Sequence, residues 1–274
     1  MIEISIVVPV HNESENIKPF LNTVESVLKK MEKSYEIIFV LDPSADDTEN
    51  IILEEIKRNK NIKLLTFSRR FGQPASTMAG IYNCKGSYCV IIDVDLQDPP
   101  ELIEDMYKKI NTGYEVIYAK RKTREGETAI KKVISSIGYY LINKLSDIQI
   151  PRDAGDYRII SRKVINQLKE LNESHGFLRG MVAFVGYKQS FIEYDRKERQ
   201  AGKSKYNKFF GSLKIGLNGL IGFSSRPLFL MSISGFIIAL ISFLLGIWYL
   251  FQKISGINLT AGLTTTVILI SFFS

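Results

Sequence analysis

Two aspartates separated by a single residue, Asp93 and Asp95, directly follow an apolar run of the chain. Like charges held this close repel each other, and a hard divalent cation relieves the repulsion. With the amide oxygen of Gln97, the two carboxylates make an all-oxygen ligand set that Mg²⁺ or Mn²⁺ accepts when water and phosphate oxygens complete it. An acidic surface turn would also explain an isolated Asp-x-Asp, but Glu13 and Asp42 follow two other apolar runs and favour a metal site.

A metal ion on a diphosphate neutralises charge that develops on the leaving group, so this ligand set indicates transfer from a nucleotide-activated donor. The sequence contains no Gly-x-x-x-x-Gly-Lys loop of a P-loop NTPase, and no Gly-x-Gly-x-x-Gly follows the first apolar run. A nucleotide sugar is therefore the donor class that fits best. Cys84 and Cys89 are the only cysteines, too few and wrongly spaced for a zinc site, and we assign them no function.

The elements that must position these residues follow from the hydrophobic pattern of the first part of the chain. β-branched runs predict strands at 2–10, 36–41, 62–67, 88–92 and 115–118. Amphipathic stretches between them predict helices over 21–31 and 46–58, and one that begins at Pro99-Pro100-Glu101. Strands joined by helices predict an α/β fold with a doubly wound, mostly parallel sheet. Ligands bind outside the carboxyl ends of such strands, so the acidic residues should converge on one edge.

Several motifs also occur in a fixed order along the chain: Pro9-Val10-His11-Asn12-Glu13, Asp42-x-Ser44, Ser68-Arg69-Arg70-Phe71-Gly72, Asp93-Val94-Asp95-Leu96-Gln97-Asp98-Pro99-Pro100, Gly155-Asp156-Tyr157-Arg158 and Gly202-Lys203-Ser204-Lys205-Tyr206. In this order they resemble the motifs of glycosyltransferase family 2. Within that family the pattern is most similar to the polyprenyl-phosphate glycosyltransferases, the relatives of dolichol-phosphate mannosyltransferase.

The resemblance implies a GT-A fold, which is Rossmann-like, and inversion at the anomeric carbon of the sugar. It implies a nucleotide-binding set of Pro9, His11, Glu13, Asp42 and Asp93. The implied metal ligands are Asp93, Asp95 and Gln97, and the implied catalytic residues are Asp95, Asp156 and Arg158. The acceptor phosphate is expected to contact Arg121, Lys131, Ser135, Lys203 and Lys205. Similar membrane proteins associate as tetramers, so a homo-oligomer is also expected.

A strong general base is not required for this reaction, because a lipid phosphate is already ionised at neutral pH and attacks once it is oriented. Asp156 could orient cations on the acceptor side or assist the sugar. Alternatively, Asp156 and Arg158 only pair with each other.

The sequence departs from the family pattern around the expected base and ribose pocket. Leu41 stands where an acidic or amide residue usually precedes Asp42, Pro43 replaces a glycine and His11 replaces a tyrosine. These departures leave the nucleotide open: a UDP-sugar is favoured, and GDP-mannose is possible.

The carboxyl-terminal part of the chain has the composition of a membrane anchor. Residues 227–252 carry no charge and are long enough to cross about 30 Å of hydrocarbon, which predicts a first transmembrane helix. A second uncharged stretch predicts that 259–274 is the start of another. The segment 206–226 has an amphipathic pattern suited to the membrane interface.

The charge pattern predicts the orientation of the anchor. The net charge is +7, and Glu198 is the last acidic residue, so basic residues dominate just before the first predicted span. The amino end does not resemble a targeting peptide. We therefore expect a cytoplasmic catalytic domain at 1–205 on a multi-pass protein of the cell (inner) membrane, with membrane lipids as partners. Nucleic acid is a poor candidate partner for a basic segment next to an anchor.

Two other functions share some of these features. A processive polysaccharide synthase would carry Gln-x-x-Arg-Trp, but the only tryptophan is Trp248, inside the predicted span. A catalytically inactive nucleotide-sugar-binding membrane scaffold would have no use for so many clustered carboxylates. The pattern therefore favours transfer of a sugar to a polyprenyl (undecaprenyl or dolichyl) phosphate.

Overall fold

The computed structural model describes residues 2–122, 154–171, 178–196 and 226–256, and further on residue 262 and residues 265–266. The chain divides into two compact units, residues 1–223 and residues 224–274.

The first unit contains a sheet of seven described strands in the order β3-β2-β1-β4-β6-β5-β7. The strands are β1 (Ile4–Val10), β2 (Tyr35–Leu41), β3 (Ile62–Thr66), β4 (Tyr88–Ile91), β5 (Val116–Arg121), β6 (Ala154–Ser161) and β7 (Gln189–Tyr194). Only β6 runs antiparallel to its two neighbours, β4 and β5. The predicted α/β fold with a mostly parallel sheet is therefore confirmed, and the antiparallel strand is a feature that the pattern did not predict.

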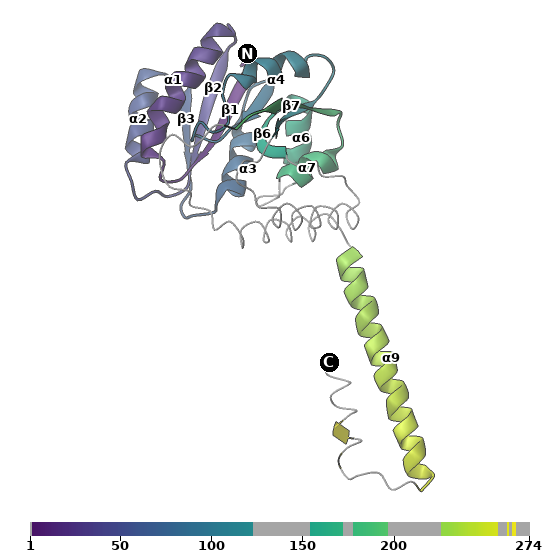
Figure 1. Ribbon diagram of the computed structural model, residues 1–274. Coiled ribbons are helices and arrows are strands. Elements are labelled where there is room, and N and C mark those ends of the chain that lie inside the picture. Colours follow the sequence, from purple (N-terminus) through teal and green to yellow (C-terminus); the bar gives the residue numbers. More distant parts are fainter. Residues whose placement is uncertain are drawn as a thin grey trace. The chain divides into compact units, whose positions relative to one another are not determined.

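Helices cover both faces of this sheet (Figure 1). One face packs against α1 (Ser14–Lys30), α2 (Thr48–Arg58) and α4 (Leu102–Ile110). The other packs against α3 (Gln73–Asn83), α6 (Arg162–Glu170) and α7 (Leu178–Val185). The predicted helices correspond to α1, α2 and α4, and the main-chain N–H groups of Leu102 and Ile103 donate to the carbonyls of Pro99 and Pro100.

Alternation along the strands explains why two cores form. On β2, Phe39 and Leu41 belong to the core under α1 and α2, while Ile38 and Val40 face α3. Side chains of successive strand residues point to opposite faces, so a strand that is apolar throughout must be covered on both. The helix α3 comes very close to β1, since a Cβ added at Gly80 would lie 2.2 Å from a methyl carbon of Val7.

In the part of the second unit that the structure describes, the long helix is α9 (Arg226–Ile254). Its residues Leu228–Gln252 have a mean hydropathy of 2.6 and are mostly exposed, so length and composition allow this helix to cross a membrane. The expected first span, 227–252, lies within α9. The described residues include only Arg226 of the expected interfacial segment 206–226, and only residues 262 and 265–266 of the expected second span 259–274.

Candidate functional site

The acidic motifs lie at one edge of the sheet, because β1, β2 and β4 are parallel. Val10 and Leu41 are paired in register at the ends of β1 and β2, and the N–H of Asp42 donates to the carbonyl of Val10 at 3.0 Å. Asp93 lies two positions after Ile91, the last residue of β4. Pro9, expected to contact the nucleotide, is partly exposed within β1.

Hydrogen bonds connect the loop after β1 to the loop after β2. Asn12 has a left-handed backbone, with φ 51°, which Asn tolerates better than most residues. Its N–H donates to Ser44 Oγ at 2.9 Å, and its Oδ1 accepts from the N–H of Ala45 at 2.6 Å. Its Nδ2 lies 3.3 Å from His11 Nε2. The loop that carries the predicted nucleotide-binding residue His11 is therefore held in one shape by its neighbour.

Glu13 follows in the same loop. Its main-chain N–H donates to Thr48 Oγ1 at 2.9 Å, and its carboxylate accepts from Asn16 Nδ2 at 2.6 Å. The side chain of Glu13 thus contacts the first turn of α1, while its backbone is tied to the start of α2. These contacts fix the position of the carboxylate before any ligand arrives.

The carboxylate of Asp42 holds the loop that leads into α3. Asp42 is 2% exposed, and its two oxygens accept from the N–H groups of Phe71 and Gly72 at 3.1 and 2.8 Å. Gly72 has φ 90°, a conformation that residues with a Cβ rarely adopt. Asp42 therefore holds the Phe71–Gly72 backbone in place, a role that the sequence motif did not predict.

The Asp93 and Asp95 pair lies in a cluster of like charge. Burial, together with the charges of Asp98, Asp95 and Asp156, raises the pKa of Asp93 to about 7, and Arg196 partly opposes the shift. Asp95 is 8% exposed, and its Oδ1 accepts from the N–H of Gln97 at 3.1 Å.

Leu96, the residue between Asp95 and Gln97, has φ 56°. A left-handed backbone at a residue with a Cβ costs free energy and persists only where its surroundings require it. The strained turn at Leu96 is therefore part of how the chain presents Asp95 and Gln97 at the same edge.

These residues fit a hard divalent cation. Within the part of the chain that the structure describes, no three His, Cys, Asp or Glu side chains form a complete metal cage. The expected set needs only two carboxylates and an amide, since Mg²⁺ characteristically takes its other ligands from water and substrate phosphates. Besides burial, repulsion from the neighbouring carboxylates raises the pKa of Asp93, and a bound cation would relieve this repulsion.

Sequence reasoning missed Gln73, the first residue of α3. Its Nε2 donates to Asp93 Oδ1 at 2.8 Å. Its position directly after the Ser68–Gly72 motif could have indicated that Gln73 belongs to the site. Asp42 holds this loop, and the loop brings the start of α3 to the same edge of the sheet.

Asp156 and Arg158 both lie on β6. One alternative from the sequence was that their side chains only pair with each other, but in the structure each side chain contacts other groups. The guanidinium of Arg158 is buried and donates to the carbonyl of Gly155 at 2.9 Å and to the carbonyl of Asp156 at 3.3 Å. Burial lowers the pKa of Arg158 to about 10. The Asp156 carboxylate pairs with Arg179 of α7, whose Nε lies 2.9 Å from Oδ1.

The charge state of Asp156 follows from its surroundings. Burial favours the neutral acid, but the charges of Arg179, Arg158 and Arg121 and the hydrogen bond from Arg179 outweigh it and lower the pKa of Asp156. Asp156 therefore carries a stable negative charge next to three cations, while Asp93 sits among anions.

Arg121, expected to bind the acceptor phosphate, ends β5. Its Nε donates to the hydroxyl of Tyr194 at 3.4 Å, and that hydroxyl donates to Asp98 Oδ1. Arg196 Nε lies 3.4 Å from the same carboxylate oxygen. The other residues expected to contact the acceptor phosphate lie outside the described residues: Lys131, Ser135, Lys203 and Lys205.

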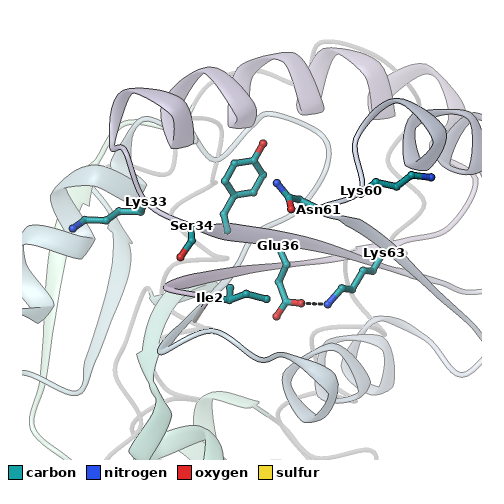
Figure 2. Close-up of a pocket in the computed structure, with 8 residues that line it drawn as sticks. Ile2, Lys33, Ser34, Glu36, Lys60, Asn61 and Lys63 are labelled. Carbon is teal, nitrogen blue, oxygen red and sulfur yellow. Dashed lines mark hydrogen bonds and ion pairs between the residues drawn. The ribbon is translucent and has the colours of Figure 1, made fainter.

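A separate pocket opens at the opposite ends of the strands, where β2 and β3 begin (Figure 2). Its buried carboxylate, Glu36, accepts from Ser5 Oγ at 2.6 Å, from the N–H of Lys85 at 2.6 Å and from Lys63 Nζ. These contacts satisfy Glu36 within the protein, so we assign the pocket no part in the chemistry.

Comparison with protein families and curated sequences identifies relatives over most of the chain. The model described as "Glycosyl transferase family 2" matches residues 5–169. The uncharacterized glycosyltransferase YkcC of Bacillus subtilis (strain 168) is 39% identical over 273 residues, which cover 100% of this chain and 84% of that protein. The bactoprenol glucosyl transferase of Shigella phage SfV is 35% identical over 270 residues, which cover 98% of this chain and 88% of that one.

Among solved structures, the glucosyl-3-phosphoglycerate synthase of Mycobacterium tuberculosis, in complex with Mn²⁺, UDP-glucose and glycerol 3-phosphate, superposes with a TM-score of 0.53. The sequences are 16% identical, and the match covers 81% of each chain. At this identity the likeness shows the fold alone, which is a GT-A-like α/β fold.

Proposed function

The chain belongs to glycosyl transferase family 2 and is a glycosyltransferase, and we propose that it transfers a sugar from a nucleotide diphosphate donor to a polyprenyl phosphate. The product would be a polyprenyl-phosphate monosaccharide with inverted configuration at the anomeric carbon. Relatives that are bactoprenol glucosyl transferases match almost the whole chain, which supports this acceptor class.

The observation that carries the proposal is the contrast between the two sides of the site. Asp93 lies among Asp98, Asp95 and Asp156, whereas Asp156 itself is surrounded by Arg179, Arg158 and Arg121. The acidic side suits a cation-bound diphosphate, and the basic side suits an anionic acceptor. A transferase that joins a nucleotide sugar to a phosphate needs both environments next to each other.

On the donor side, we propose that Pro9, His11, Glu13 and Asp42 hold the nucleoside. Glu13 and the loop around His11 are already fixed by hydrogen bonds from Asn16 and Asn12, so little rotamer freedom is lost on binding. Asp42 acts mainly through the Phe71–Gly72 loop, whose N–H groups it accepts. A UDP-sugar is the favoured donor.

Asp93, Asp95 and Gln97 would hold Mg²⁺ or Mn²⁺. A bound divalent cation neutralises the charge that develops on the leaving nucleotide diphosphate. Gln73 keeps Asp93 oriented through the 2.8 Å hydrogen bond to Oδ1. The turn at Leu96 keeps Asp95 and Gln97 at the same edge.

On the acceptor side, Arg121 with Lys131, Ser135, Lys203 and Lys205 would bind the lipid phosphate. The phosphate oxygen is the nucleophile, so these residues need only orient it and hold its charge. Asp156 holds Arg179 through the ion pair, and the charge of Arg121 also acts on its carboxylate. Arg158, whose guanidinium is bound to main-chain carbonyls, supports the strand that carries Asp156.

The long apolar helix α9 fits an enzyme whose acceptor is a membrane lipid. We propose that the protein is a multi-pass membrane protein with a cytoplasmic catalytic domain, and that it associates as a homo-oligomer in contact with membrane lipids. The predicted second span at 259–274 belongs to this proposal.

Transfer of radiolabelled sugar to polyprenyl phosphate tests the proposed function. Membranes that contain the protein are given a panel of UDP- and GDP-sugars with Mn²⁺, with Mg²⁺ or with EDTA. We expect label in the lipid phase with one donor and loss of label with EDTA. Folded protein that binds a nucleotide sugar but labels no lipid would instead support the inactive scaffold.

A further inference from the structure

Tyr194 connects two parts of the site that are distant in the sequence. It is the last residue of β7 and is 5% exposed. The parallel pairing of β5 with β7 places it directly opposite Arg121, the last residue of β5. Arg121 Nε donates to the Tyr194 hydroxyl at 3.4 Å, so the register of two strands sets this contact.

The same hydroxyl donates to Asp98 Oδ1. Asp98 is 3% exposed and closes the acidic motif that begins at Asp93. Arg196, two residues beyond Tyr194, places its Nε 3.4 Å from the same oxygen. Tyr194 therefore lies between the acidic motif and Arg121.

Only a hydroxyl suits this position. It must accept from a guanidinium and donate to a carboxylate at the same time, and a tyrosine hydroxyl has one donor hydrogen and free lone pairs. Burial and the nearby charge of Asp98 raise the pKa of Tyr194 well above its ordinary value, so the hydroxyl keeps its proton at neutral pH.

We propose that Tyr194 is a positioning residue that links the donor side of the site to the acceptor side, by holding Arg121 at a fixed distance from the Asp93–Asp98 loop. This inference rests on the proposed function, in which Arg121 binds the acceptor phosphate. A fixed Arg121 holds the phosphate at one distance from the sugar, and a small misplacement at this point slows an in-line attack strongly.

Tyr157 provides a matched control. Its ring packs edge to face against Tyr194, with centroids 6.4 Å apart and an interplanar angle of 88°. It is buried, and its hydroxyl donates to the carbonyl of Pro99 at 2.9 Å, one residue after Asp98. Tyr157→Phe and Tyr194→Phe each remove one buried hydroxyl from the same cluster, but only the second removes a link to Arg121.

The experiment compares these two variants in the full chain. The melting temperature, the KM for polyprenyl phosphate and the affinity for the nucleotide sugar are measured for each. We expect Tyr194→Phe to raise the acceptor KM about 10- to 100-fold, the range for a lost hydrogen bond to a charged group. Donor affinity should be unchanged within about twofold, and Tyr157→Phe should leave both constants within about twofold of wild type.

A double-mutant cycle tests whether Tyr194 acts through Arg121. In an Arg121→Gln background, Tyr194→Phe should have little further effect on the acceptor KM, because its target is already absent. Equal effects of the two tyrosine variants, or full additivity in the cycle, would overturn the inference. If Tyr194→Phe does not fold, Asp98→Asn weakens the same link, and it must raise the acceptor KM by a larger factor than the donor KM.

A binding measurement with farnesyl monophosphate separates this inference from the proposed function. If wild-type protein transfers no sugar to polyprenyl phosphate, the proposed reaction is wrong. Weaker binding of farnesyl monophosphate by Tyr194→Phe than by Tyr157→Phe would still support the link to an anion-binding Arg121. Equal binding by the two variants would overturn it.

Discussion

Arg179 Nε lies 2.9 Å from Asp156 Oδ1, and this ion pair joins α7 to β6 across 23 positions of the sequence. The side chain of Arg179 is 22% exposed and that of Asp156 is 38% exposed, so the ion pair is partly accessible to solvent. The pair therefore sets both the direction and the charge of Asp156, the carboxylate that lies among the cations of the site.

Substitution of Arg179 should alter the pH dependence of the reaction. Arg179 is one of the groups that lower the pKa of Asp156 against the effect of burial, so Arg179→Gln should raise that pKa. Activity that needs ionised Asp156 would then be lost at a higher pH as the solution is acidified. We expect kcat to fall about 10- to 100-fold and the acid limb of the pH–rate profile to move upward, with partial recovery in Arg179→Lys.

Arg162→Gln is the control for this prediction, since the guanidinium of Arg162 donates to the carbonyls of Cys84 and Gly86 at the opposite edge of the sheet, where β4 begins. It should lower stability without a shift of the acid limb. An unshifted profile in Arg179→Gln would show that the ion pair has only a structural role.

Asp95→Asn should abolish transfer while the protein still folds. The substitution keeps the shape of a side chain at the end of a strand but removes negative charge from the expected metal ligands. We expect a loss of at least about a hundredfold in transfer of radiolabelled sugar, with a melting temperature close to that of wild type. Asp105→Asn, at an exposed position of α4, is the control. An unchanged rate in Asp95→Asn would exclude the metal assignment.

Most of the fold could be predicted from the sequence, because the strands β1 to β5 are short β-branched runs and the helices between them are amphipathic. The antiparallel strand β6 could not. Its residues Asp156 and Arg158 are charged, and Arg158 is 2% exposed, although arginine is almost never buried without partners. The partners are main-chain carbonyls of the same strand, a contact that residue types alone do not reveal.

The site was predictable where function depends on residues that follow one another in the chain, and less so where it depends on contacts between distant segments. The Asp93-x-Asp95 spacing was enough to expect a cation. Gln73, Arg179 and Tyr194 reach the site through the packing of α3, the start of α7 and the register of β5 with β7. Their partners are set by tertiary structure, so local spacing carries little signal for them.

Glu36→Gln should destabilise the protein in a pH-dependent way. Burial raises the pKa of Glu36, but hydrogen bonds from Lys63, Ser5 and the N–H of Lys85 outweigh it, so the net shift is downward. A carboxyl group with a lowered pKa stabilises the fold above its unfolded pKa and loses that contribution as pH falls through the folded pKa. We expect a loss of about 2 kcal/mol at pH 7, or a drop of about 4–8 °C in Tm.

The difference in Tm between Glu36→Gln and wild type should persist down to the ordinary pKa of a glutamate and shrink only as the pH falls further, through the lowered pKa of Glu36, because the wild-type carboxylate is then protonated as well. Sugar transfer at pH 7 and a temperature well below Tm should be unaffected, since the pocket of Figure 2 lies at the opposite ends of the strands from Asp42. A difference that does not depend on pH would argue against an ionised Glu36.

The double substitution Lys203→Ala, Lys205→Ala should weaken the use of the lipid acceptor more than binding of the donor. These lysines belong to the basic segment before the expected interfacial helix, where ammonium groups attract anionic headgroups and the lipid phosphate. We expect the KM for polyprenyl phosphate to rise about tenfold, with nucleotide-sugar affinity unchanged, and the effect to diminish at high salt. Lys57→Ala, Lys60→Ala removes the same charge from exposed positions at the end of α2 and controls for net charge. If both double variants lose acceptor affinity equally, the effect comes from overall charge, and the acceptor-side placement of Lys203 and Lys205 is wrong.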